Sequence, residues 1–209
     1  MTTAVEPPAG VEHRAFGAPG AERSVVVVRT GPTAMVDPDP AATAARDVTV
    51  VAVGLAEIAL SDPATFGGQT PAEEMARLLA GFIRARAGER PVGVVGVGAT
   101  GTVALLLAAE LGDDVDRLAL IGVPAPETPI DRDDGEIVTA RVTAKTLIMN
   151  GQRDPDAAAA AARWYHDRLP GSRVEMVPAS ALPRGDGRLP VDLVWDRVLS
   201  HVAPGTKLT

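Results

Sequence analysis

The segment Gly96–Gly101, which reads Gly-Val-Gly-Ala-Thr-Gly, has the residue types and spacing of a functional turn between a buried strand and a buried helix. It matches G-x-G-x-x-G, in which glycines let the backbone approach a dinucleotide pyrophosphate. It also takes the place of a G-x-S-x-G turn, which exposes a nucleophilic serine. Gly98 would then replace the serine, and Thr100 the second glycine. In a third interpretation, the glycines only let the helix pack close to the strand.

The dinucleotide interpretation fails two checks. About 20 residues after the fingerprint, an acid should end the next strand and bind the ribose. Residues 118–122 (Leu-Ala-Leu-Ile-Gly) contain neither an acid nor an arginine. The fingerprint also normally opens its domain, whereas here two strand patterns and a long helical pattern precede it. Nucleotide binding at Gly96–Gly101 is therefore the less favoured alternative.

The composition is that of one domain with its own core, and it narrows the classes of function. Of the 209 residues, 46% are hydrophobic and 22% are charged, which is enough apolar surface for a sizeable core. Twenty-seven acids against 20 bases give a net charge of −7. Neither a nucleic acid nor an anionic membrane attracts such a surface, so we expect no partner of either kind.

Few side chains are available for chemistry. Cysteine is absent, which excludes disulfides, zinc–thiolate sites and a cysteine nucleophile. We expect no metal and no cofactor. An imidazole base would have to be His13, His166 or His201, the three histidines of the chain. The first residues lack the basic and apolar regions of a signal peptide, so we expect a cytoplasmic protein.

Patterns typical of strands and of helices alternate along the chain on both sides of this turn. Valine-rich runs with nearly continuous hydrophobicity indicate parallel strands that are buried on both faces. Strands are predicted over 24–29, 47–53, 92–97, 117–122, 145–150 and 173–178, with a weaker antiparallel edge strand over 11–16. Helical patterns cover 71–87, 99–111, 156–169 and 191–202, the first with Thr70 as its N-cap.

This alternation predicts an α/β fold: a three-layer αβα sandwich with a mostly parallel sheet of about six or seven strands. We expect one domain over residues 1–209, with 1–10 and 203–209 as flexible tails. In such sheets ligands bind beyond the carboxyl ends of the strands. The turn at Gly98 lies at that edge.

From about Val11 to Val202 the chain resembles the α/β-hydrolase fold, segment by segment and in the same order. SVVVVRTGP resembles the strand and loop of the oxyanion region. VVAVGLAEIALSDP, ending in Ser61-Asp62-Pro63, resembles the next strand and its loop. Three longer matches follow: residues 92–126 resemble the nucleophile elbow, the helix behind it and the next strand; residues 144–155 resemble the strand and loop of the triad acid; residues 173–183 resemble the last strand and the loop of the triad histidine.

The resemblance implies an acyl-transfer site, which needs a nucleophile, an imidazole and an acid. On the matching positions stand Gly98 for the nucleophile, Asp154 for the acid, and Ala181 or Leu182 for the histidine. Two of the three members are missing. The loop that directly follows the last predicted strand contains no histidine, so we expect all three to be surface residues. The hydroxyls of Thr100, Thr102 and Ser180 have no evident base, and serine-type hydrolysis is not expected.

Two further features follow from the same comparison. Asp154 precedes Pro155, and an N-cap of the helix over 156–169 is the favoured interpretation, with a catalytic remnant as the alternative. The oxyanion donors would be the N–H of Ala99 and that of Gly31; if Pro32 holds the second position, no N–H is present. The connection between the strands at 117–122 and 145–150 is short, so we expect no lid.

These residues predict a catalytically degenerate α/β-hydrolase-fold protein that binds a small ligand or acts as a scaffold, with a homodimer as one form of the latter. The ligand residues would be Gly31, Gly98, Ala99, Thr100 and Asp154. The alternative is an enzyme of the same fold, hydrolase- or lyase-like, that uses backbone donors and Asp154 instead of a triad. If the turn is a nucleophile elbow, Gly98 should have a positive φ.

Overall fold

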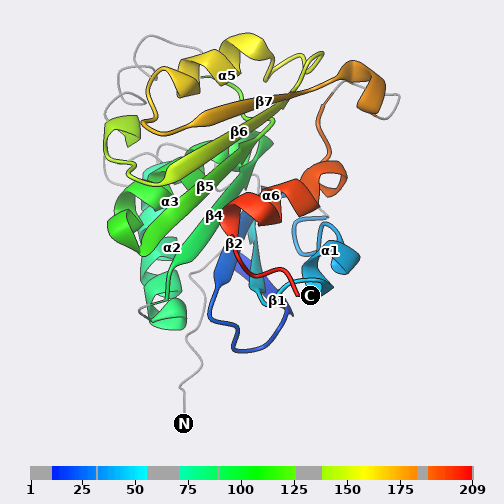
Figure 1. Cartoon of the computed structure of the whole chain (residues 1–209). Coiled ribbons are helices and arrows are strands. Elements are labelled where there is room, and N and C mark those ends of the chain that lie inside the picture. The colour runs from blue at the N-terminus through cyan, green and yellow to red at the C-terminus, as the bar shows by residue number, and fades with distance from the viewer. Residues whose placement is uncertain are drawn as a thin grey trace.

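One sheet of seven strands, in the order β1-β3-β2-β4-β5-β6-β7, organises the chain (Figure 1). The computed structural model describes residues 11–31, 33–55, 71–88, 90–125, 138–182 and 188–208. The strands are β1 (Val11–Gly17), β2 (Ser24–Thr30), β3 (Thr49–Leu55), β4 (Val92–Val97), β5 (Val115–Ile121), β6 (Lys145–Gly151) and β7 (Arg173–Val177).

The direction of the strands confirms the predicted sheet. β1 pairs with β3 antiparallel, and each later neighbouring pair is parallel. The valine runs are buried on both faces, as their continuous hydrophobicity predicts: Val25, Val26, Val27 and Val28 are each at most 1% exposed. The carboxyl ends of β2–β7 therefore meet at one edge, which we call the carboxyl edge; the opposite edge is the amino edge.

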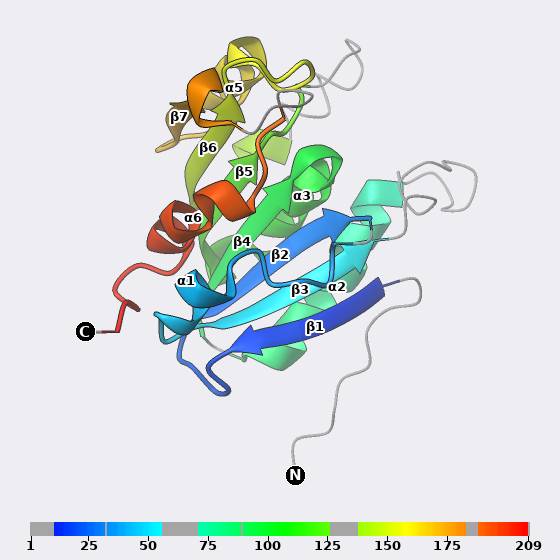
Figure 2. The ribbon, with the colours of Figure 1, turned by 90° about the vertical axis from the view of Figure 1, so that its right-hand side faces the viewer.

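Helices cover both faces of this sheet (Figure 2). They are α1 (Pro40–Ala44), α2 (Pro71–Ala87), α3 (Gly101–Leu111), α5 (Ala159–His166) and α6 (Trp195–Val202). Buried side chains of α2, α3 and α5 share one core cluster with one face of the strands, and α6 builds the cluster on the other face. α1 packs beside α6. The three-layer αβα architecture is therefore confirmed.

Four helix boundaries differ from the predicted ones, and one helix was not predicted. A 3₁₀ turn, Gly98–Thr100, precedes α3, and another, Asp192–Val194, precedes α6. α5 (Ala159–His166) begins three residues later and ends three residues earlier than predicted. α1 was missed because its five residues are too few for a periodic pattern, although Asp39 caps it and proline stands at its start.

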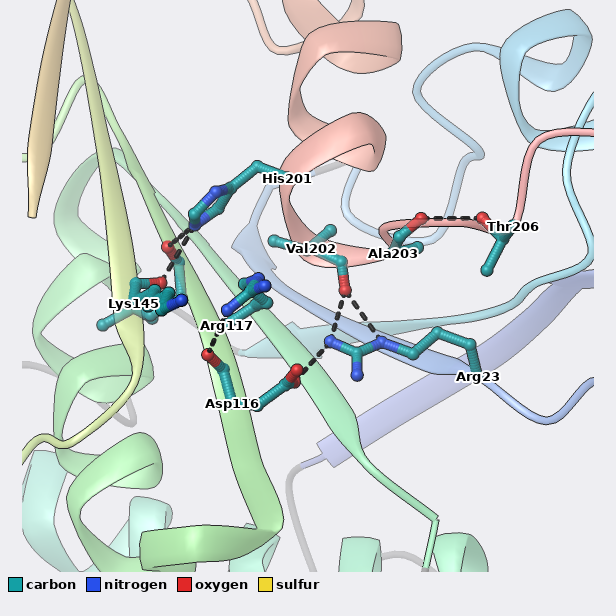
Figure 3. Close-up of polar contacts among 9 residues, drawn as sticks. Arg23, Asp116, Arg117, Lys145, His201, Val202, Ala203 and Thr206 are labelled. Carbon is teal, nitrogen blue, oxygen red and sulfur yellow. Dashed lines mark hydrogen bonds and ion pairs between the residues drawn. The ribbon is translucent and has the colours of Figure 1, made fainter. Parts of the chain in front are cut away.

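The end of α6 is fastened to the amino edge by Arg23 (Figure 3). Arg23 is 7% exposed. Its Nε donates to the carbonyl of Val202 at 2.9 Å, and its Nη2 donates to the same carbonyl at 2.6 Å and to Asp116 Oδ1 at 2.6 Å. Gly93 lies directly beneath, where a Cβ would be 2.5 Å from the Val202 carbonyl oxygen. Arg23 therefore bonds the last carbonyl of α6 where the helix meets β4.

The segment after α6 corrects the expectation of a flexible C-terminal tail, as far as Leu208. Ala203 is fully buried. The N–H of Asp47 donates to the Thr206 carbonyl at 2.8 Å, and the N–H of Leu208 donates to the Ala45 carbonyl at 2.9 Å. These main-chain bonds hold the segment against the residues before β3. The tail expected over 1–10 lies outside the described residues, as does the predicted N-cap Thr70.

Within the described residues, no helix has the length and apolar character needed to cross a membrane.

Candidate functional site

The carboxyl edge brings together the turns that follow β2, β4, β5, β6 and β7. Gly31, Gly98, Gly122, Asp154 and Ala181 stand on these turns, in that order along the chain. Gly122 and Asp154 come close across the edge: a Cβ on Gly122 would be 3.6 Å from Asp154 Oδ2. Ser61 and Asp62, which the resemblance places in the turn after β3, lie outside the described residues.

Gly98 has the backbone conformation predicted for it. Its φ is +60°, a left-handed value that glycine adopts at little cost and other residues rarely adopt. Gly98 is half-buried and its neighbour Ala99 is exposed. A Cβ on Gly98 would meet no atom within 4 Å. Because space is open there, the conformation and not crowding accounts for the glycine at this position.

The other two glycines of the motif have a packing role. A Cβ on Gly96 would lie 2.6 Å from Ala104 Cβ and 2.8 Å from Gly101 Cα. A Cβ on Gly101 would lie 2.3 Å from a methyl group of Val123. α3 thus approaches β4 and the end of β5 more closely than any residue with a side chain allows. The spacing that resembles a dinucleotide fingerprint is accounted for by close packing at two glycines and a left-handed turn at the third.

Thr100, which was expected to contact a ligand, is buried beneath the turn. Its side chain is fully buried. The hydroxyl Oγ1 lies 2.6 Å from the Val28 carbonyl and 2.9 Å from the Val97 carbonyl, and the Val97 N–H reaches it at 3.3 Å. Thr100 therefore ties the ends of β2 and β4 together beneath the turn, and its hydroxyl is engaged by main-chain groups.

Asp154 is a turn residue with a buried carboxylate. It is 4% exposed. Its Oδ1 accepts the N–H of Asp156 at 3.0 Å and the N–H of Ala157 at 2.9 Å. These bonds are those of an N-cap, but the N-cap of α5 is Ala158, so the predicted helix cap is wrong in position. Asp154 instead closes an Asx turn that leads toward the helix.

Asp154→Ala is expected to lower the free energy of unfolding by about 1–3 kcal/mol, because two N–H groups lose their acceptor, one of them on the fully buried Ala157. Asp154→Asn keeps an oxygen at the same place and should lose much less. Urea denaturation of both variants measures the difference. Equal losses in Asn and Ala would mean that the negative charge, and not the two hydrogen bonds, is what Asp154 provides.

The loop after β7 contains no histidine. Ala181 is exposed in the 3₁₀ turn Ala179–Ala181, as is Ser180. Leu182 packs against the core on the α6 side of the sheet.

The histidines lie elsewhere. His13 lies on β1 with Nε2 3.5 Å from Arg86 Nη1, and His166 Nδ1 is 2.9 Å from Ser172 Oγ.

His201 corrects the expectation that every histidine is a surface residue. It is half-buried at the amino edge (Figure 3). Its Nε2 carries a proton, since it reaches two carbonyl oxygens, that of Leu118 at 3.1 Å and that of Lys145 at 2.9 Å. Burial lowers the pKa of His201 below its usual value. The imidazole therefore fastens α6 to β5 and β6 and is far in the fold from Gly98.

Arg29 is a charged side chain at the carboxyl edge for which the sequence alone predicts no role. It stands one residue before the end of β2, two before Gly31, and it is half-buried. Its Nη1 donates to the Val36 carbonyl at 3.3 Å and its Nη2 donates to Thr33 Oγ1 at 3.0 Å. The one available signal was a charged residue in a run of four buried valines, on the side of the strand that faces the core at Val25 and Val27.

The turn after β2 could supply backbone donors. Gly31 is exposed, with a φ of +81°. Pro32, which decides between the two alternatives for the second oxyanion donor, lies outside the described residues, as do residues 126–137, where a lid would be inserted.

No group of three or more histidine, cysteine or acidic side chains in the described part of the chain could hold a metal ion. A cavity of about 490 Å³ lies at the amino edge, between α1, the end of β1 and Leu208. Phe16, Asp37 and Arg46 line it. The guanidinium of Arg46 is paired with Asp196 at 2.8 Å. None of the predicted site residues lies in this cavity.

The mostly parallel sheet, its antiparallel first strand and its two helical layers define the α/β-hydrolase fold, and comparison with solved structures confirms it. No family model matches the sequence, and no curated protein does. A protein from Thermoplasma acidophilum described as a predicted CIB-like hydrolase is similar at a TM-score of 0.58 and 18% identity, over 90% of each chain.

Two other solved structures are similar over most of their lengths. A thermophilic esterase from Thermogutta terrifontis has a TM-score of 0.55 and 16% identity, over 90% of this chain and 89% of its own. An enol-lactonase from Burkholderia xenovorans has a TM-score of 0.58 and 14% identity, over 80% of this chain and 87% of its own. At these identities the likeness establishes the fold alone.

Proposed function

We propose that the protein is a catalytically degenerate member of this fold that binds a small ligand at the carboxyl edge without serine-hydrolase turnover. The observation that carries the proposal is Gly98. It occupies the turn between β4 and α3 at which hydrolases of this fold expose their nucleophile, with a left-handed φ of +60° and open space around it. The backbone needed to present a nucleophile is there, and the side chain is not.

The surroundings support the same conclusion. The positions that the resemblance assigns to the imidazole are those of Ala181 or Leu182, and neither side chain is a base; the three histidines lie on β1, at the end of α5 and near the end of α6. Asp154 stands on the position that the resemblance assigns to the acid, but its Oδ1 is bonded to two main-chain N–H groups. Without a base no hydroxyl nearby is activated.

Ligand binding is supported by what the edge retains. The N–H groups that open a helix lack partners within the helix and carry partial positive charge. Ala99, which follows Gly98, and Gly31, which stands two residues after Arg29, are both exposed. A scaffold role has less support, since the large exposed apolar side chains Val36, Val174, Leu193 and Leu208 stand on four different segments.

The proposal is tested by measuring the hydrolysis of p-nitrophenyl acetate and p-nitrophenyl butyrate. We expect the protein to add nothing to the background rate, and Asp154→Asn to leave the rate unchanged, because no nucleophile–base pair exists for the acid to orient. Gly98→Ser is the matched control: it should fold and still add nothing, since its proton has no acceptor. Saturable turnover by the wild-type protein would overturn the proposal.

A further inference from the structure

Arg29 lies on β2 beside the turn that contains Gly98. Val28 on β2 pairs with Gly96 on β4 in parallel register, so the next positions along the two strands, Arg29 and Val97, are neighbours. Side chains alternate along a strand, and Val27 belongs to the core cluster on the α6 side. Arg29 and Val97 therefore lie on this side of the sheet, and Val97 leads directly into Gly98.

The charge of Arg29 is not balanced by contact with an acid. The two nearly buried arginines each have a carboxylate partner: Arg23 contacts Asp116 at 2.6 Å and Arg46 contacts Asp196 at 2.8 Å. Arg29 makes no ion pair within the described residues; its two hydrogen bonds go to a main-chain carbonyl and a threonine hydroxyl.

Burial lowers the pKa of Arg29, and the charge of Asp192 opposes this from beyond contact distance. A partly buried cation with no carboxylate in contact is costly unless a ligand supplies the counter-charge.

The guanidinium of Arg29 also has more N–H donors than its two hydrogen bonds use. It carries five N–H donors in a planar fork that matches a carboxylate. Two hydrogen bonds use one donor each on Nη1 and Nη2. Next to it, the side chain of Val97 is only partly buried and packs against the core on the α6 side. An anion with a small apolar group would satisfy both features.

We propose that Arg29 is the anion-binding residue of the carboxyl edge, and that the ligand bound there is a small carboxylate with an apolar tail. The carboxylate would accept from the free N–H groups of Arg29, and the tail would cover Val97. This inference rests on the proposed function, because it names the ligand class of the same site.

The test is a ¹H–¹⁵N NMR titration with acetate, hexanoate and benzoate, and with the neutral amide of each. For the wild-type protein we expect the carboxylates to shift the amide resonances of Gly31, Gly98 and Ala99 saturably, with affinity at least tenfold above that of the amides. Added salt should weaken the carboxylates and leave the amides unchanged. This comparison needs no variant and so does not depend on the folding of one.

Three variants separate anion binding from a structural role. Arg29→Gln should reduce carboxylate affinity at least tenfold while its spectrum stays dispersed. Thr33→Val removes the hydroxyl that Arg29 contacts but keeps the charge, and should bind as the wild type does. Arg153→Gln removes an exposed charge from the loop after β6 at the same edge, and should also bind as the wild type does.

Each possible outcome of these titrations supports or overturns the inference. Equal affinity of carboxylates and amides, or unchanged binding in Arg29→Gln, would overturn the inference while leaving ligand binding at the edge intact. Loss of binding in Thr33→Val to the same extent as in Arg29→Gln would make Arg29 a residue that only holds the loop, and so would overturn it too. Ester turnover by the wild-type protein would overturn the proposed function instead, whatever Arg29 does.

Discussion

Gly101→Ala is expected to lower the free energy of unfolding by about 1–3 kcal/mol, the usual cost of adding a methyl group to a well-packed core. The new Cβ would lie 2.3 Å and 2.4 Å from the methyl carbons of Val123 and 2.9 Å from its Cβ. Val123 is 1% exposed, and its β-branched side chain has little rotational freedom. The variant must therefore push α3 away from the end of β5. Chemical denaturation measures the change.

Gly81→Ala is the matched control. Gly81 lies in α2 and a Cβ there would meet nothing within 4 Å, so alanine should stabilise the helix by about 0.5–1 kcal/mol. The double variant Gly101→Ala/Val123→Ala should be more stable than the sum of the two single changes predicts, since the clashing methyl groups are gone. Additive losses, or a neutral Gly101→Ala, would contradict the packing role of this glycine.

Arg23→Met is expected to cost about 1.5–3 kcal/mol, the range for hydrogen bonds to charged groups. The substitution keeps the apolar length of the side chain, but it leaves the carbonyl of Val202 without its donor at the buried end of α6. Because α6 builds the core on its side of the sheet, hydrogen exchange should rise first in α6 and in the segment after it. Chemical denaturation measures the loss of stability, and hydrogen exchange followed by mass spectrometry shows whether α6 and the segment after it open first.

Asp116→Asn separates the ion pair from the helix contact. The side chain of Asp116 is 41% exposed, so its charge stays hydrated and its loss should cost less than the loss of Arg23. If Asp116→Asn were as destabilising as Arg23→Met, the ion pair and not the bond to the end of α6 would be the source of the stability.

The strands and the layered fold could be predicted because they depend on local composition. Continuous valine runs indicate burial on both faces, and their alternation with helical patterns favours a parallel sheet covered by helices. The long α2 begins and ends at the predicted residues, 71 and 87. The left-handed φ of Gly98 was also predictable, since the sharp turn between a buried strand and a helix requires it.

What could not be predicted depends on contacts between segments distant along the chain. Arg23 and Val202 are 179 residues apart, and no local pattern indicates that one caps the other. The half-buried position of His201 arises in the same way, from carbonyl groups of β5 and β6. Thr100 was proposed as a ligand residue because it stands in the motif, but whether a hydroxyl points out or in depends on Val28, which lies on another strand.

We propose that the chain has the sharp strand-to-helix turn of hydrolases of this fold without their nucleophile, and covalent labelling with a fluorophosphonate probe tests this claim. The intact mass of the purified protein should stay unchanged after incubation with excess probe, and Gly98→Ser should behave the same, because its hydroxyl would have no base. The addition of one probe group per wild-type molecule, mapped to Thr102 or Ser180, would show that an activated hydroxyl exists and would contradict the claim.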